Sequence, residues 1–433
     1  MIPGEYVMPR KILFIVGLIL ITTALFIAGC SAGPQGSEGP IGPAGPAGPQ
    51  GPAGPPGEDA SVRLEYVGAE KCGECHEDAY AKYTLSGHAS NFTKVVDGQA
   101  PVYAYDNVTG GISRPPEGYT WEDISYVVGG YGWKALFVDS KGYVITNPPG
   151  ETGVADYENQ FNFANEDLEE NAGWSSYHSG EEQTPMECAS CHTTGYHTEG
   201  HQDDLEGIVG TWAFENVQCE ACHGAGSLHA SDPYGFRMVL DRTNQACGEC
   251  HSRESVTHVE AANGFAQQYQ QFDQLYNSEH FAVQCIACHD PHASTVHADP
   301  NLNPTAGIRQ TCDTCHWENV YQNNEEHVRL ECTDCHMAKA GQSALANLEV
   351  FTGDLSSHLF SINPDPNAPQ FNEDGTLSMP YLTLNYACNN CHGVFATAKD
   401  MQELADMAEG YHTRPEPTAT PSPELTPEAT VTP

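Results

Sequence analysis

Cys188-Ala189-Ser190-Cys191-His192 is one of eight copies of a pattern in which two cysteines, separated by two residues, are followed at once by a histidine. The copies begin at Cys72, Cys188, Cys219, Cys247, Cys285, Cys312, Cys332 and Cys388. This pattern is the attachment signature of a c-type haem. The two thiols form thioethers with the haem vinyl groups, and the adjacent imidazole can bind the iron from one face. The sequence therefore predicts eight covalently attached haem c groups.

The cysteine count supports this interpretation. The chain has 17 cysteines, and only Cys30 lies outside the motifs. The predicted thioether residues are Cys72, Cys75, Cys188, Cys191, Cys219, Cys222, Cys247, Cys250, Cys285, Cys288, Cys312, Cys315, Cys332, Cys335, Cys388 and Cys391. The predicted proximal iron ligands are His76, His192, His223, His251, His289, His316, His336 and His392. Zinc is the alternative for Cys-x-x-Cys pairs, but a zinc site does not require a histidine directly after every pair.

The composition predicts the fold class. Hydrophobic residues make up 39% of the chain and charged residues 17%. From Ser61 to His412 there are about 44 residues for each motif, so porphyrin would fill much of the core. We expect a mainly α and irregular multihaem cytochrome c fold, low in regular secondary structure, with a small β-hairpin or sheet insertion and disordered ends.

The charge limits the partners of the chain. A formal net charge of −41 excludes nucleic-acid binding by phosphate neutralisation. Such a surface attracts cationic partners at low salt, although solubility alone explains it equally well. We expect redox partner proteins or external electron donors and acceptors.

The N-terminus resembles a bacterial lipoprotein signal. Arg10-Lys11 precede an apolar run that ends in the lipobox-like Ile27-Ala28-Gly29-Cys30. Residues 1–29 would be removed, and Cys30 would carry the lipid. An uncleaved membrane helix is the alternative, because the run is near the lower length limit for spanning. We expect an exported chain, anchored on the outer face of the cytoplasmic membrane or on the outer membrane or cell surface.

A collagen-like spacer follows the lipid site. Glycine occupies every third position from Gly33 to Gly57, and proline is frequent between. A collagen triple helix needs this spacing and would imply a trimer. A solvated polyproline-like spacer over residues 30–60 would not, and it is the interpretation we favour. A homo-oligomer is compatible with either.

The rest of the chain divides into two regions with four motifs each, residues 61–260 and 261–412. The first carries a β insertion at about residues 99–165, with turn chemistry at 139–142. Residues 413–433 are rich in Pro, Thr and Glu and are expected to be disordered.

Local patterns predict helices over residues 77–85 and 264–276. Lys134 falls within one predicted strand of the insertion. Lysine replaces histidine as an axial ligand in some multihaem reductases, but we favour a solvent-facing strand lysine.

Twelve of the 20 histidines lie outside the motifs, and eight of them would suffice to give every iron a second histidine ligand. Our candidate distal ligands are His88, His229, His280, His292, His327 and His358. Weaker candidates are His178, His197, His201, His258 and His297, and His412 is expected to be spare beside the tail. Saturated irons carry electrons without binding substrate, so no catalytic residue is predicted. An iron without its distal histidine would be open, and the sequence does not exclude one.

Four segments resemble octahaem cytochromes c: Cys72 to His88, Cys188 to Tyr196, Cys219 to His229 and Cys247 to His251. That group includes hydroxylamine oxidoreductase-like and tetrathionate reductase-like proteins, and the segments also resemble the tetrahaem electron acceptor of hydroxylamine oxidoreductase. The resemblance implies haems in near-parallel pairs joined by near-perpendicular contacts. No motif ends in lysine, and Tyr411 is the sole tyrosine beyond the last motif, which departs from the enzymes of this group.

Three functions remain open from the sequence. The first is a lipoprotein that transfers electrons at the cell surface or in the periplasm through mostly bis-His haems, which we favour over a substrate-converting enzyme. The second is an octahaem oxidoreductase of a small nitrogen or sulfur compound, such as nitrite, hydroxylamine or tetrathionate. It requires one five-coordinate haem in a polar pocket. The third is a subunit of an extracellular cytochrome filament.

Overall fold

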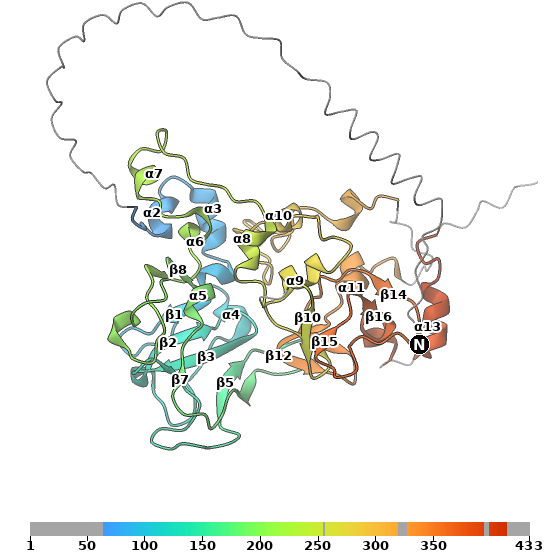
Figure 1. The fold of residues 1–433 in the computed structure, drawn as a ribbon, viewed down its shortest axis with the longest axis horizontal. Helices are drawn as coiled ribbons and strands as arrows, with labels where there is room; N and C mark the ends of the chain where they lie inside the picture. The colour runs from blue at the N-terminus through green and yellow to red at the C-terminus, as the bar shows by residue number, and fades with distance from the viewer. Residues whose placement is uncertain (1–63, 254–255, 319–326, 394–397, 414–433) are drawn as a thin grey trace, which may run out of the picture. The chain divides into compact units, whose positions relative to one another are not determined.

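The computed structural model describes residues 64–253, 256–318, 327–393 and 398–413 (Figure 1). The predicted signal peptide, Cys30, the Gly-x-y spacer and the Pro-rich tail lie outside these residues. Within the described ranges, no helix is long and apolar enough to cross a membrane.

A seven-stranded sheet occupies the stretch between the first and second motifs. Its strands are β1 (Phe92–Lys94), β2 (Ile124–Gly129), β3 (Lys134–Asp139), β4 (Tyr143–Val144), β5 (Glu158–Asn162), β6 (Gly173–Ser176) and β7 (Thr184–Pro185). The order is β1-β2-β3-β4-β7, and β5 pairs with both β3 and β6. The predicted hairpin is present, but the sheet extends beyond residues 99–165 at both ends.

The turn between β3 and β4 forms as its sequence predicts. The carboxylate of Asp139 accepts hydrogen bonds from the backbone N–H groups of Lys141 and Tyr143, both at 2.9 Å. Gly142 has a φ of 93°, which a residue with a Cβ rarely adopts.

The two faces of this sheet bury different clusters, because successive side chains of a strand point to opposite faces. Val127 and Phe137 pack in one cluster, while Tyr126 and Val138 pack in the other. The second cluster includes Ala189 and packs against Cys188 of the second motif. One face of the sheet therefore supports the second haem motif directly.

A second sheet was not predicted. It has five strands: β10 (Val259–Ala262), β11 (Phe265–Gln267), β12 (Gly341–Asn347), β13 (Thr352–Leu355) and β15 (Leu377–Ser378), in the order β13-β12-β11-β10-β15. Two smaller pairs join β8 (Thr193–Thr194) to β9 (Phe214–Glu215) and β14 (Ile362–Asn363) to β16 (Leu382–Thr383).

The predicted helix over residues 264–276 is correct only in its second half. Residues 271–276 form α9 (Gln271–Tyr276), but β11 pairs with β10 and with β12 instead of continuing that helix. Phe265 and Ala266 are buried in that sheet, and Tyr269 has a left-handed φ of 65° that prevents a continuous helix. Tertiary pairing has overridden the local pattern here.

The motifs themselves lie on single turns of helix. These are α2 (Ala69–Gly73), α5 (Ala189–His192), α6 (Cys219–His223), α8 (Asn244–Gly248), α10 (Cys285–Cys288), the 3-10 turn η4 (Cys312–Thr314), α11 (Cys332–His336) and α12 (Asn390–His392), which follows the π-helical turn η6 (Asn385–Asn389). In the first motif the His76 N–H donates to the carbonyl of Cys72 at 2.9 Å. Such a turn brings the first cysteine and the histidine to one side of the backbone, as attachment to one porphyrin requires.

The remaining helices are also short. They are α3 (Glu77–Tyr83), which agrees with the predicted helix over residues 77–85, α4 (Asp106–Thr109), α7 (Ser227–Ser231) and α13 (Met401–Ala408), with 3-10 turns η1 (Gly87–Ala89), η2 (Trp121–Asp123) and η3 (Gln202–Asp204). Helix accounts for 24% of the residues that the structure describes and strand for 21%, so the predicted low content of regular secondary structure is confirmed.

Candidate haem sites

Seven motif histidines each face a second histidine from outside the motifs. Their ring centroids lie 5.7–6.4 Å apart. The pairs are His76 with His229, His223 with His292, His251 with His88, His289 with His358, His316 with His280, His336 with His412, and His392 with His327.

This spacing fits an iron between the two rings. A metal–imidazole bond is about 2.0 Å long and the ring centre lies roughly 1.1 Å beyond the nitrogen, so two imidazoles on opposite faces of one iron have centroids about 6.2 Å apart. Burial lowers the pKa of His88 and of His358 to about 4. Both imidazoles are therefore neutral at physiological pH, which is the form that binds a metal.

The structure places all six candidate distal ligands opposite a motif histidine. It also places His412 there, which corrects the expectation that this residue is spare. Leu404 and Ala405 of α13 are buried and hold the helix against the protein, so the chain beyond it is ordered as far as His412. Tyr411 meanwhile lies with its hydroxyl 2.8 Å from Nδ1 of His327. His412 thus lies opposite the histidine of the seventh motif, and Tyr411 contacts the histidine that lies opposite the eighth motif.

The second motif differs from the other seven. The Nδ1 of His192 lies 3.0 Å from the carbonyl oxygen of Asn91, an arrangement that orients the ring. No imidazole lies opposite His192 within the described residues, which contain every histidine of the chain.

The five weaker candidates make other contacts. His178 lies 2.8 Å from Glu181, His201 2.6 Å from the carbonyl oxygen of Ile208, and His258 3.2 Å from the hydroxyl of Thr257. His197 pairs through its backbone with Thr211, and His297 packs against Tyr105 and Tyr131. None of them forms a ring pair with a motif histidine in the described part of the chain.

Lys134 lies beside the second motif, and the prediction of a solvent-facing lysine is wrong. Its Nζ donates a hydrogen bond to the carbonyl of Ser343 at 2.7 Å. Burial lowers the pKa of Lys134 to about 8, although Asp354 and Cys188 act in the opposite direction. The neighbouring Trp133 donates to the carbonyl of Asp354, so this end of β3 docks against β12 and β13. That contact turns the lysine inward.

The hairpin that carries Lys134 is closed by a glycine. Gly129 has a φ of 82°, and a Cβ there would lie 2.4 Å from the carbonyl oxygen of Lys134. Only glycine permits the two backbones to approach so closely at this point.

Two tyrosines and an arginine complete the surroundings of the second motif. Burial raises the pKa of Tyr269, and the charges of Cys188, Tyr177 and Cys191 raise it further, while Arg253 lowers it. The side chain of Tyr269 is nevertheless 42% exposed, so it remains accessible from solvent. Its left-handed backbone is a strained conformation of the kind often held at functional sites. Ammonium, guanidinium and phenol groups together can donate hydrogen bonds to a small anion.

Hydrogen bonds and electrostatic interactions between thiols indicate which motifs lie near one another. Cys72 interacts with Cys219, and Cys222 interacts with Cys247, so the first, third and fourth motifs follow one another. Cys247 then contacts Cys285 of the fifth motif.

The same contacts extend to the eighth motif. The further neighbours are Cys288 with Cys315, Cys312 with Cys332, and Cys335 with Cys388. The second motif joins at the fourth, through Cys191 and Cys250. Seven motifs therefore form a row, and the second is a branch from it.

The chain is similar to known multihaem cytochromes. The family model described as cytochrome c554 and c-prime matches residues 156–224, which contain the second and third motifs. The dissimilatory sulfite reductase MccA of Wolinella succinogenes is 20% identical over 68% of this chain and 50% of its own length. The multiheme cytochrome MtrA of Shewanella baltica is 23% identical over 34% of this chain and 44% of its own. The chain thus spans about half the length of the curated relatives it matches.

A solved structure shares the fold. The octaheme sulfite reductase MccA of Wolinella succinogenes superposes with a TM-score of 0.55 at 18% identity, covering 80% of this chain and 71% of that one. Together with the motifs, these matches define a c-type cytochrome with several haems. The matches and the motifs agree on haem c as the cofactor.

Proposed function

We propose that this chain carries eight haems and acts as an oxidoreductase: seven bis-His haems conduct electrons to or from one open haem at His192, where a small anion reacts. The observation that carries the proposal is the difference between the motif histidines. Seven of them face a second imidazole and His192 does not. This favours the enzyme among the functions that the sequence leaves open.

The residues around His192 suit an anionic substrate. A haem iron held by one imidazole offers its other axial position to a substrate and exchanges electrons with it. Lys134, whose pKa of about 8 keeps it mostly charged at neutral pH, would hold the anion and supply a proton. The pKa of Tyr269 is raised, so its hydroxyl stays protonated and would donate a hydrogen bond to the same anion.

The branch position of the second motif suits delivery of electrons. The fourth motif contacts it and lies within the row of the other motifs. Electrons entering at either end of the row would therefore reach the open haem by way of the fourth haem. The bis-His irons in the row are saturated and would carry electrons without binding substrate.

Sulfite is the substrate to test first, because the relative that shares the fold is named a sulfite reductase. The test is turnover of the purified holoprotein with reduced viologen and sulfite, nitrite, hydroxylamine or tetrathionate, each assayed separately. We expect turnover of sulfite, with nitrite and hydroxylamine as the next candidates. Absence of turnover with all four would leave an electron carrier without a substrate.

The location of the protein is a separate proposal. The lipobox-like segment ending at Cys30 and the Gly-x-y segment support an exported lipoprotein held off a membrane by a spacer. Cys30→Ala should move the protein from the membrane fraction to the soluble fraction. Equal membrane retention of the variant would contradict the lipid anchor.

Assembly into a cytochrome filament has less support. That function predicts an axial histidine donated between subunits. The chain itself supplies the second imidazole of seven pairs within its described residues, so only the site at His192 leaves room for such a donor. Electron microscopy of native cell surfaces would reveal filaments if they form.

A further inference from the structure

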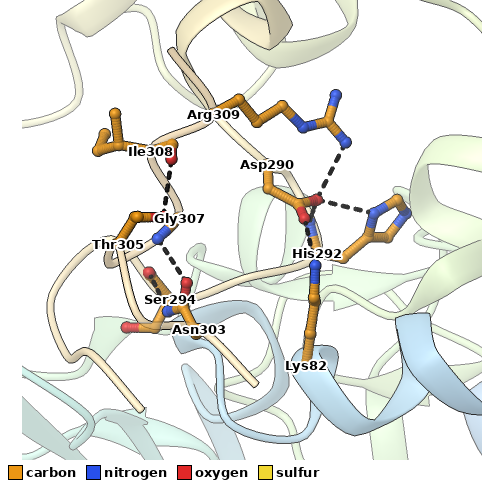
Figure 2. A network of polar contacts seen from close by, with 9 residues as sticks. All are labelled: Lys82, Asp290, His292, Ser294, Asn303, Thr305, Gly307, Ile308 and Arg309. Carbon is orange, nitrogen blue, oxygen red and sulfur yellow. Dashed lines mark hydrogen bonds and ion pairs between the residues drawn. The ribbon is translucent and has the colours of Figure 1, made fainter. Parts of the chain in front are cut away.

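Asp290 lies at the centre of a network of charged groups beside the third haem site (Figure 2). Its Oδ1 is 3.1 Å from Nδ1 of His292, the residue opposite His223. Its Oδ2 accepts a hydrogen bond from Lys82 Nζ at 3.0 Å, and its Oδ1 accepts one from Arg309 Nη2 at 3.3 Å. The Asp290 side chain is only 13% exposed, so water screens these interactions weakly.

The other paired histidines have weaker partners at Nδ1. His229 and His336 lie 2.7 Å from the backbone carbonyl oxygens of Phe236 and Phe360. For His251 the partner is the side-chain amide of Gln271 at 3.4 Å, and for His327 it is a phenol. None of these four printed partners is a carboxylate, whereas His292 has a carboxylate at this position.

A carboxylate at Nδ1 changes what the imidazole does at the metal. It accepts the Nδ1–H bond and increases electron donation from the opposite nitrogen. Greater donation and the added negative charge both favour ferric over ferrous iron, so the reduction potential falls. Lys82 and Arg309 act in the opposite direction, because each shares the carboxylate and brings a positive charge.

We propose that Asp290 is a positioning residue that holds the haem at His223 and His292 at a lower potential than its neighbours in the row, while Lys82 and Arg309 limit this effect. The inference rests on the proposed bis-His site at the third motif but not on the open haem at His192. Because the third motif lies between the first and the fourth, its low potential separates the first haem from the five haems beyond the third in the row by an uphill step.

The ring planes give this haem its own spectral signature. The planes of His223 and His292 are 3° apart, whereas the other pairs are 18–61° apart. Near-parallel axial imidazoles give a rhombic low-spin ferric spectrum, and strongly tilted ones shift the lowest-field line further downfield. A redox titration of the holoprotein followed by electron paramagnetic resonance (EPR) can therefore follow the rhombic signal separately from those of the most tilted pairs.

Asp290→Asn keeps the size of the side chain and one acceptor oxygen but removes the charge. We expect the midpoint of the most rhombic signal to rise by the equivalent of about a tenfold change in the reduction equilibrium, about 59 mV for one electron. Lys82→Met, at the surface end of α3, should shift the same midpoint down. Glu181→Gln is the control and should leave this midpoint unchanged, because Glu181 contacts His178, which faces no motif histidine.

The opposite signs separate tuning from a purely structural role. If Asp290 only fixed the loop, both variants would loosen the same contact and shift the midpoint in the same direction. That result, or an unchanged midpoint in Asp290→Asn, would overturn the inference. The titration does not depend on turnover, so a failed turnover assay would leave its result valid. If the wild-type protein has no rhombic signal, the proposed bis-His site at the third motif is wrong.

Discussion

The second and fourth haem motifs are neighbours, yet only the histidine of the fourth faces a second imidazole in the described residues. Cys191 of one motif contacts Cys250 of the other. His251 faces His88, with ring centroids 6.3 Å apart, while His192 faces no imidazole in the described residues. One short segment serves both sites, because it carries His88 on η1 and, three residues later, the carbonyl of Asn91 that orients His192. The same stretch of chain closes one site and supports the proximal ligand of the other.

The difference arises from what lies near each motif. The seven-stranded sheet packs against Cys188 and Ala189 and places Lys134 beside the second motif. At the fourth motif, the histidine opposite His251 is His88, which lies on the short 3-10 turn η1. The longest stretch between two motifs therefore forms a folded support for the second motif, whose histidine faces no second imidazole in the described residues. The following variants test this difference between the second and fourth sites.

Removing the charge of Lys134 should have the largest effect. Lys134→Gln is expected to lower turnover of the anionic substrate by about 10²–10³-fold, the usual loss when one donor to developing negative charge is removed. Steady-state kinetics with reduced viologen would measure it. Lys94→Gln is the matched control, because Lys94 pairs with Asp203 at the surface and should leave the rate unchanged. Equal rates for both variants would remove Lys134 from the site.

The pH dependence should follow the same lysine. Since burial lowers the pKa of Lys134 to about 8, its charged form is present below that pH and is lost above it. Anion affinity should therefore fall about fivefold over the first pH unit above the pKa and about tenfold for each further unit. Binding titrations on either side of pH 8 would show this in the wild type. A similar fall in Lys134→Gln would assign the dependence to another group.

The hydroxyl of Tyr269 should contribute less. Tyr269→Phe keeps the ring and removes one neutral hydrogen bond, for which we expect a loss of about 0.5–1.5 kcal/mol, or several-fold in kcat/KM. Tyr276→Phe is the control, because Tyr276 is exposed on the neighbouring α9. If the two variants have the same kcat/KM, the phenol does not contact the substrate.

Removing the second histidine of the fourth site should change the measured quantity least, by about twofold. It nevertheless tests the difference between the second and fourth sites directly. His88→Ala removes the imidazole opposite His251, so the high-spin ferric content per chain should rise about twofold. Cyanide binding followed by absorbance would give the same ratio. His178→Ala should leave the content unchanged. No increase in His88→Ala would show that His88 is not the ligand.

Local chemistry explains what could be predicted from the sequence. The Cys-x-x-Cys-His pattern forms within one helical turn, so all eight motifs could be recognised without the fold. The six candidate distal histidines could be proposed because each belongs to a short segment near a motif. The turn at Asp139 and helix α3 likewise depend on neighbouring residues alone.

Distant contacts explain what could not be predicted. Lys134 turns inward because Ser343 and Asp354 lie beside β3, more than 200 residues further along the chain. The second sheet depends on the parallel pairing of β11 with β12, which joins residues 75 positions apart in the chain. His412 was missed because its neighbours in sequence resemble a disordered tail, although the apolar face of α13 anchors it.

Spin quantitation by EPR tests the proposed division of the haems most directly. The oxidised holoprotein is measured at low temperature before and after cyanide is added, with the haem content of the same sample determined independently. We predict one high-spin haem for every seven low-spin haems, and its conversion to low spin by cyanide. A fully low-spin spectrum before cyanide, or more than one high-spin haem per chain, would contradict the open site at His192.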